Sequence, residues 1–134
     1  MWKFFILILS LSTFGCHSVA TELVMDPNLS PRQMEAVVLA ADYWCDMGEA
    51  CLPVSVGENN GEGYVTSQSS CEPSAAGEMH RENMTIHLCD DRDHLLDRVV
   101  PHEIGHALGL NHVKRSGEVM SRYIEGQPVV IDLD

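Results

Sequence analysis

Basic residues are scarce in this chain of 134 residues. It has 8 Lys and Arg against 20 Asp and Glu, which gives a formal net charge of −12 at pH 7. No cluster of Lys or Arg is present that could neutralise a row of phosphates, so we do not expect nucleic acid as a partner. The negative charge suits the surface of an exported protein and favours basic substrates, but it does not indicate a fold.

A long apolar segment is also missing. The apolar run at residues 4–11 is well short of the roughly 20 residues that a membrane-spanning helix requires. Because Lys3 precedes this run, residues 1–15 are predicted to be a signal peptide. Cys16 resembles the end of a bacterial lipobox, although Thr13 stands where Leu is usual. We expect export, either anchored to a bacterial membrane by lipid on Cys16 or, after ordinary cleavage, as a secreted or periplasmic protein.

Internal repeats and low-complexity tracts are absent, and the length allows one domain. Within it, we expect residues 16–28 to form a tether or a first strand and residues 29–134 to form the folded domain. The sequence does not indicate a second subunit, and we expect a monomer.

Cysteine occurs five times, and an odd number in an exported protein needs an explanation. If Cys16 carries lipid, the other four are enough for two disulfides in an oxidising compartment. Of the three connectivities we favour Cys45–Cys51 and Cys71–Cys89, because the first pair closes a short loop after a predicted helix. Free buried thiols are the alternative.

Local patterns predict a small set of helices and strands. Ser30 suits an N-cap and Pro31 the first helical position, so we expect a helix over residues 31–46. Segments in which apolar and polar residues alternate predict strands over residues 52–56, 64–66 and 84–88. A polar segment predicts a long loop over residues 67–82.

A proline complicates the next helix. Inside a helix Pro101 would remove a hydrogen bond and clash with the preceding turn. Either the motif helix starts near Pro101, or a longer helix is kinked there. We favour a short turn over residues 92–99 and a separate helix over residues 101–109.

Residues 102–112 read His-Glu-Ile-Gly-His-Ala-Leu-Gly-Leu-Asn-His. His102 and His106 are four residues apart, so they share one helix face and can reach one metal ion. Gly109 can adopt positive φ and end the helix, which lets the chain turn back and bring His112 as a third ligand. The motif contains no cysteine, which argues against a structural Cys/His site.

Three neutral ligands leave the fourth position of a zinc ion open, as is typical of catalytic zinc. Zinc in such a site lowers the pKa of its bound water and polarises a scissile carbonyl. Glu103 follows the first ligand and is placed to act as general base toward the water. The motif therefore predicts a zinc-dependent metalloendopeptidase.

At this point the sequence resembles the metzincin superfamily, whose histidine motif is followed by a Met-turn. Met120, in Glu-Val-Met-Ser, fits that turn, and its spacing from His112 is most similar to that of the matrixin branch. The resemblance implies an α+β fold, in which a small mixed twisted sheet packs on two helices. It also implies one catalytic zinc, a Met-turn floor beneath it, and a protein or peptide substrate that lies along the sheet edge as an added strand.

The chain departs from that family after the Met-turn. Fourteen residues follow Met120, so we expect a truncated C-terminal subdomain and an incomplete S1′ wall. Tyr123 is a candidate transition-state stabiliser, as tyrosines are in some metzincins, although its spacing from Met120 is one residue longer than theirs. Two alternatives to a peptidase stay open: a non-catalytic zinc-binding lipoprotein and an inactive truncated metzincin relative.

Calcium is a weaker expectation. Asp90, Asp91 and Asp93 could bind it, as acidic residues do in matrixins, but we favour an exposed acidic turn over a calcium site. His80 and His87 could belong to a second zinc site, for which the sequence does not identify enough further ligands.

Overall fold

The computed structural model describes residues 19–69, 71, 75–114, 118–123 and 131. The expected signal peptide over residues 1–15 and the lipidation site Cys16 lie outside these residues. No helix among the described residues is long and apolar enough to span a bilayer.

The first helix, α1, spans Pro31–Asp46 and has the bounds that the sequence predicts. Its start is a capping box. The Ser30 hydroxyl accepts from the Gln33 backbone N–H at 3.1 Å, and the Gln33 side chain accepts from the Ser30 N–H at 2.9 Å, which satisfies two donors that helix geometry leaves unpaired. The helix buries one face, including Val37, Ala41 and Trp44.

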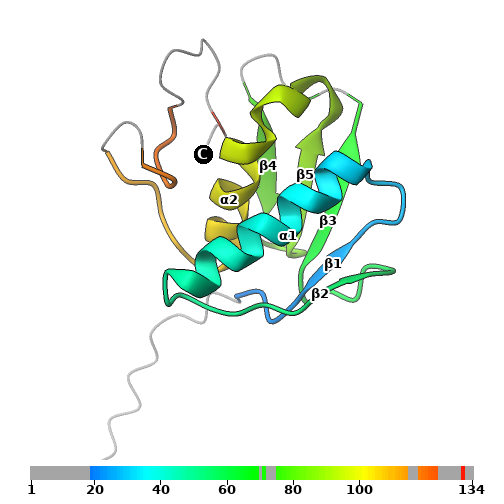
Figure 1. Ribbon diagram of the computed structural model, residues 1–134, viewed down its shortest axis with the longest axis horizontal. Helices are drawn as coiled ribbons and strands as arrows, with labels where there is room; N and C mark the ends of the chain where they lie inside the picture. The colour runs from blue at the N-terminus through cyan, green and yellow to red at the C-terminus, as the bar shows by residue number, and fades with distance from the viewer. Residues whose placement is uncertain (1–18, 70, 72–74, 115–117, 124–130, 132–134) are drawn as a thin grey trace, which may run out of the picture.

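A five-stranded mixed sheet has the order β2-β1-β3-β5-β4. The strands are β1 (Leu23–Met25), β2 (Val54–Val56), β3 (Tyr64–Gln68), β4 (Gly77–His80) and β5 (Thr85–Cys89). All neighbouring pairs are parallel except β4 with β5. Helices α1 and α2 (Leu96–Ala107) pack on each other and against the sheet (Figure 1), so the predicted α+β architecture is confirmed.

The N-terminal segment takes part in this sheet. Of the two roles expected for residues 16–28, the first strand is the one observed, because β1 lies between β2 and β3. At the end of β1, the Asp26 carboxylate accepts from the Asn28 backbone N–H at 2.8 Å and from the Thr66 hydroxyl at 2.7 Å. These hydrogen bonds favour the charged form, and they lower the pKa of Asp26 below its ordinary value.

The loop predicted over residues 67–82 is wrong in its second half. Gly77–His80 forms β4, an edge strand that is antiparallel to β5. Its residues are mostly half-buried rather than alternately buried and exposed. A half-buried edge strand does not require the apolar alternation that reveals a strand in the sequence.

The favoured prediction around Pro101 is also wrong, and the alternative of a longer helix that includes the proline is the one observed. Residues Asp90–Leu95 form a 3₁₀ helix, and α2 then begins at Leu96 and runs through Pro101 instead of starting beside it. The proline removes the hydrogen bond that the carbonyl of Asp97 would accept. Because Asp97 is exposed, water can take the place of that donor, and burial of Val99 and Val100 holds the helix together on its other side.

Two disulfides join the pairs that the sequence analysis favoured. Cys45–Cys51 connects the end of α1 to the segment that leads to β2, and Cys71–Cys89 connects the segment after β3 to the end of β5. The second bridge therefore restrains both ends of the chain that forms β4 and its hairpin.

Candidate metal centre

Helix α2 carries the first two histidines of the motif on one face. It ends as predicted at a glycine, since Gly109 has φ of +89° and donates its N–H to the His106 carbonyl at 2.9 Å. The chain reverses there, and the Leu110 N–H returns to the Gly105 carbonyl at 2.9 Å. This turn brings His112 back to the face that bears His102 and His106.

The three imidazoles converge on one point. The Nε2 atoms of His102 and His106 are 3.0 Å apart, those of His106 and His112 3.1 Å, and those of His102 and His112 3.2 Å. Zinc binds imidazole nitrogen at about 2.0–2.1 Å, and a tetrahedral ion then separates two ligand atoms by about 3.3 Å. The observed triangle therefore fits one zinc ion.

The outer nitrogens orient two of these rings. Nδ1 of His102 lies 2.8 Å from the Val119 carbonyl oxygen, and Nδ1 of His106 lies 2.9 Å from the Leu110 carbonyl oxygen. A carbonyl can only accept, so Nδ1 is the protonated nitrogen in both rings. The Nε2 lone pairs then face one another, and a shared cation relieves their repulsion. Backbone carbonyls of this kind are common partners of metal-binding histidines.

Glu103 lies beside this centre but is not part of the ligand cluster. Its side chain is fully buried, with 0% exposed. Among the residues that the structure describes, the group of close ligand atoms consists of the three imidazoles. This arrangement agrees with a carboxylate that acts near the metal rather than on it.

Gly77 is a site residue that the sequence reasoning missed. A Cβ at this position would lie 3.3 Å from Cγ of Glu103 and 2.7 Å from a Val99 methyl group. Only glycine therefore lets the edge strand β4 approach the buried carboxylate this closely. The only sequence feature that could have revealed this role is the glycine itself. Because the segment was interpreted as a loop, where glycine is common, the glycine did not indicate a strand.

Met120 lies directly against α2. It is 6% exposed, its carbonyl accepts from the Val113 N–H at 3.0 Å, and the preceding residue, Val119, holds His102. The surface of α2 beneath it is Gly105, where an added Cβ would lie 2.3 Å from the Met120 sulfur and 2.9 Å from Trp44 Cζ2. Met120 thus packs against the helix that carries His102 and His106, and its role as a Met-turn floor stays a prediction.

Gly105→Ala is expected to destabilise the fold by about 1–3 kcal/mol, the range for overpacking a filled interior, and to weaken zinc binding. The methyl group would push the Met120 segment away from α2, and with it the Val119 carbonyl that orients His102. Calorimetry and zinc titration measure the two effects. Gly57→Ala is the control, because its Cβ would make only an ordinary 3.6 Å contact with Val24. Equal stability of the two variants would contradict this packing argument.

The structure places the two residues after Ser121 differently. Tyr123, the candidate transition-state stabiliser, is 61% exposed, and it is not among the residues that line the cavity beside the histidines. Arg122 does line that cavity, and its Nη2 is 3.4 Å from His112 Nδ1. A role for Tyr123 stays a prediction, and Arg122 is a second site residue that the sequence reasoning missed.

The acidic turn has protein partners of its own. The Asp90 carboxylate accepts from the Gln33 side-chain amide at 2.8 Å, and Asp91 lies 3.8 Å from the Arg92 guanidinium. Within the described part of the chain, the three histidines form the one cluster with the proximity of a metal site. Nothing in this arrangement supports calcium at Asp90, Asp91 or Asp93.

His80 and His87 form a second, smaller histidine pair on β4 and β5. Their ring centroids are 4.9 Å apart, and His80 Nε2 lies 3.2 Å from a Glu78 carboxylate oxygen. Burial, with the neighbouring His80, lowers the pKa of His87. The pair does not join the cluster of three.

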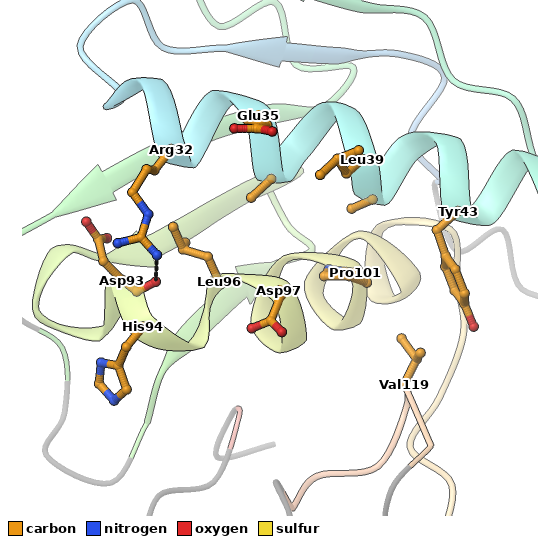
Figure 2. Close-up of a pocket in the computed structure, with 12 residues that line it drawn as sticks. Arg32, Glu35, Leu39, Tyr43, Asp93, His94, Leu96, Asp97, Pro101 and Val119 are labelled. Carbon is orange, nitrogen blue, oxygen red and sulfur yellow. Dashed lines mark hydrogen bonds between the residues drawn. The ribbon is translucent and has the colours of Figure 1, made fainter.

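A separate cavity of about 440 Å³ lies between α1 and α2, away from the histidine cluster. Figure 2 shows Leu39 and Tyr43 of α1 on one side and Leu96 and Pro101 of α2 on the other, with Val119 at one end. Trp44 donates from Nε1 to the Pro101 carbonyl at 2.8 Å, so this interface holds α2 in place directly before His102.

The sequence matches the family model for matrixin over residues 57–134, which is more than half of the chain. No curated protein matches the chain at a significant level. The solved structure of myroilysin is similar, with 21% identity and a TM-score of 0.48, over 71% of this chain and 50% of that one. The chain thus spans half the length of the myroilysin chain that it matches. By the match to the family model, the chain belongs to the matrixin family.

Proposed function

We propose that the protein is a zinc-dependent metalloendopeptidase that hydrolyses peptide bonds outside the cytoplasm. The observation that carries the proposal is the convergence of the His102, His106 and His112 Nε2 atoms to within 3.0–3.2 Å of one another. The buried Glu103 beside them and membership in the matrixin family support a metallopeptidase. The two disulfides agree with an oxidising compartment.

Each residue has a distinct task in this proposal. The three imidazoles would hold zinc, which when bound supplies Lewis acidity toward water and the scissile carbonyl. Glu103 accepts a proton from the attacking water and delivers it to the leaving nitrogen. Its burial between α2 and β4 excludes bulk water from the carboxylate, which strengthens its electrostatic interactions with the reacting groups.

The edge strand β4 would orient the substrate. Ala76 and Gly77 donate their N–H groups to the Ile131 carbonyl at 3.1 and 3.0 Å, so the backbone of Gly77 points away from β5. Backbone groups alternate along a strand with a period of two, so those of Met79 point the same way. Met79 also lines the cavity beside the histidines, where its backbone can pair with an extended peptide.

The test is hydrolysis of a casein-like substrate by the purified protein before chelation, after chelation, and after zinc is restored. We expect one zinc per chain, loss of nearly all activity on chelation, and recovery with zinc. A non-catalytic zinc protein would hold the metal and cleave nothing, and an inactive relative would show neither recovery nor activity. Either result would reject the proposal.

The intact mass of the mature protein separates lipidated Cys16 from ordinary secretion.

A further inference from the structure

The cavity beside the histidines has a charge that differs from the rest of the molecule. Its volume is about 590 Å³, and the described residues that line it include His106, His112, two arginines, Arg81 and Arg122, and one carboxylate, Glu82. The chain has only 8 Lys and Arg against 20 Asp and Glu. Two of these few cations therefore lie around the cavity that His106 and His112 line.

Arg122 lies in this wall and is held there through its backbone. Its guanidinium approaches His112 Nδ1 at 3.4 Å. Its carbonyl accepts from the Ile131 N–H at 2.8 Å, and the Ile131 carbonyl in turn accepts from Gly77 at the start of β4. If His112 binds a metal through Nε2, its Nδ1 carries the ring proton. Nδ1–H and the Arg122 guanidinium are then both donors and do not bond each other, but an acceptor such as a carboxylate oxygen can bridge them.

Arg81 belongs to a different wall. It directly follows β4, whose Met79 lines the same cavity. The carboxylate of its neighbour Glu82 lies 3.4 Å from His80 Nδ1, so Glu82 has a contact of its own within the hairpin. The two arginines therefore approach the cavity from the β4–β5 hairpin and from the segment after Met120.

We propose that this cavity is a carboxylate subsite, which makes the peptidase selective for peptides with a carboxylate close to the scissile bond. The inference rests on the proposed function and names its substrate class. A guanidinium can bind a carboxylate through two parallel hydrogen bonds, and such charge-assisted bonds are about twice as strong as neutral ones. The carboxylate comes from an Asp or Glu side chain or from the C-terminus of the peptide.

The negative charge of the whole chain acts against this selectivity only at long range. At an ionic strength near 0.15 M, interactions beyond about 8 Å are largely screened. Contacts inside the cavity are closer than that and persist. At physiological ionic strength the long-range repulsion should therefore be weak.

The experiment compares three peptides that share one scissile bond. Two are amidated and carry Glu or Gln beside that bond, and the third is the Gln peptide shortened to end in a free carboxylate near it. We expect the wild-type kcat/KM for the Glu peptide or for the free-acid peptide to be at least tenfold higher than that for the amidated Gln peptide. Whichever of the first two peptides is cleaved faster shows whether the carboxylate comes from a side chain or from the C-terminus. Equal values for all three would overturn the subsite.

The variants Arg122→Gln and Arg81→Gln are expected to reduce that preference to about threefold or less. Cleavage of the amidated Gln peptide should fall much less than cleavage of the preferred peptide. Arg32→Gln is the matched control, because Arg32 lies on α1 and its side chain donates to the Asp93 carbonyl at 3.5 Å, away from this cavity. If Arg122→Gln does not fold, the exposed Arg81 still provides the test. A preference that both arginine variants leave unchanged would also overturn the subsite.

A binding measurement separates failure of the subsite from failure of the proposed function. Zinc-loaded Glu103→Ala protein, which is expected not to turn over peptide, is titrated with the same peptides. The subsite is supported if this protein binds the carboxylate peptide more tightly than the amidated Gln peptide and if adding Arg122→Gln removes the difference. This holds even if the wild-type protein hydrolyses nothing. Hydrolysis of all peptides with equal binding supports the peptidase and overturns the subsite.

Discussion

Replacing Glu103 by alanine is expected to remove nearly all hydrolysis while the protein keeps its zinc. General acid–base catalysis by one positioned side chain contributes about 10²–10⁴-fold, and Glu103 would serve both the water and the leaving nitrogen. We therefore expect kcat to fall by about 10³-fold or more. His102 and His106 keep their partners at Val119 and Leu110, and the substitution does not touch His112, so metal analysis should still find one zinc per chain.

Two further substitutions test whether the carboxylate itself is required. Glu103→Gln preserves the size of this fully buried side chain but cannot accept the proton, so it should be as inactive as Glu103→Ala. It should melt at the wild-type temperature or above, because an amide is less costly to bury than a charge. Glu103→Asp keeps a base but retracts it, and should retain a small activity. Cleavage by Glu103→Gln at the wild-type rate would remove Glu103 from the mechanism.

Features with local causes could be predicted from the sequence. The bounds of α1 follow from the Ser30 cap, the proline at the first helical position and an apolar face with helical spacing. The pairing of His102 with His106 follows from a spacing of four on one helix, and the return of His112 follows from the positive φ of Gly109. Each of these depends on residues that are close together in the chain.

Features with long-range causes could not be predicted in this way. β4 is a strand because it pairs with β5, and its mixed polar sequence does not reveal this. Helix α2 continues through Pro101 because its buried face packs on the core and its exposed face can lose a hydrogen bond. Local sequence signals a break at the proline, and only tertiary packing outweighs that signal.

The residues of the candidate site also fall into these two groups, those predictable from local sequence and those that depend on long-range contacts. The proposed zinc ligands could be predicted because one motif contains all three, whereas Gly77 and Arg122 become site residues only through contacts across the fold. Gly77 adjoins Glu103 from the sheet edge. Arg122 contacts His112 from the segment after Met120. In that segment the family resemblance suggested the neighbouring residue, Tyr123, as the site residue.

His112→Ala is expected to weaken zinc binding by about 100-fold or more. Loss of a partner that merely orients a metal ligand already costs 10–100-fold, and His112 supplies one of the three converging nitrogens. It is half-buried in the turn after α2, so the metal-free protein should keep its fold. His94→Ala, the same change at an exposed position on the 3₁₀ helix, is the control and should leave the affinity unchanged.

The same substitution should appear in the thermal stability, because a ligand that binds only the folded state stabilises it by RT ln(1 + [L]/Kd). With free zinc about 1,000-fold above the wild-type Kd, this is about 4 kcal/mol. A 100-fold weaker site retains only about 1.4 kcal/mol. For a domain of this size the difference of nearly 3 kcal/mol corresponds to roughly 10 °C in Tm. Thermal melts of both proteins with zinc and with chelator measure it. An equal zinc-dependent shift in the two proteins would mean that His112 does not bind the metal, and the site would then have only the two ligands of α2.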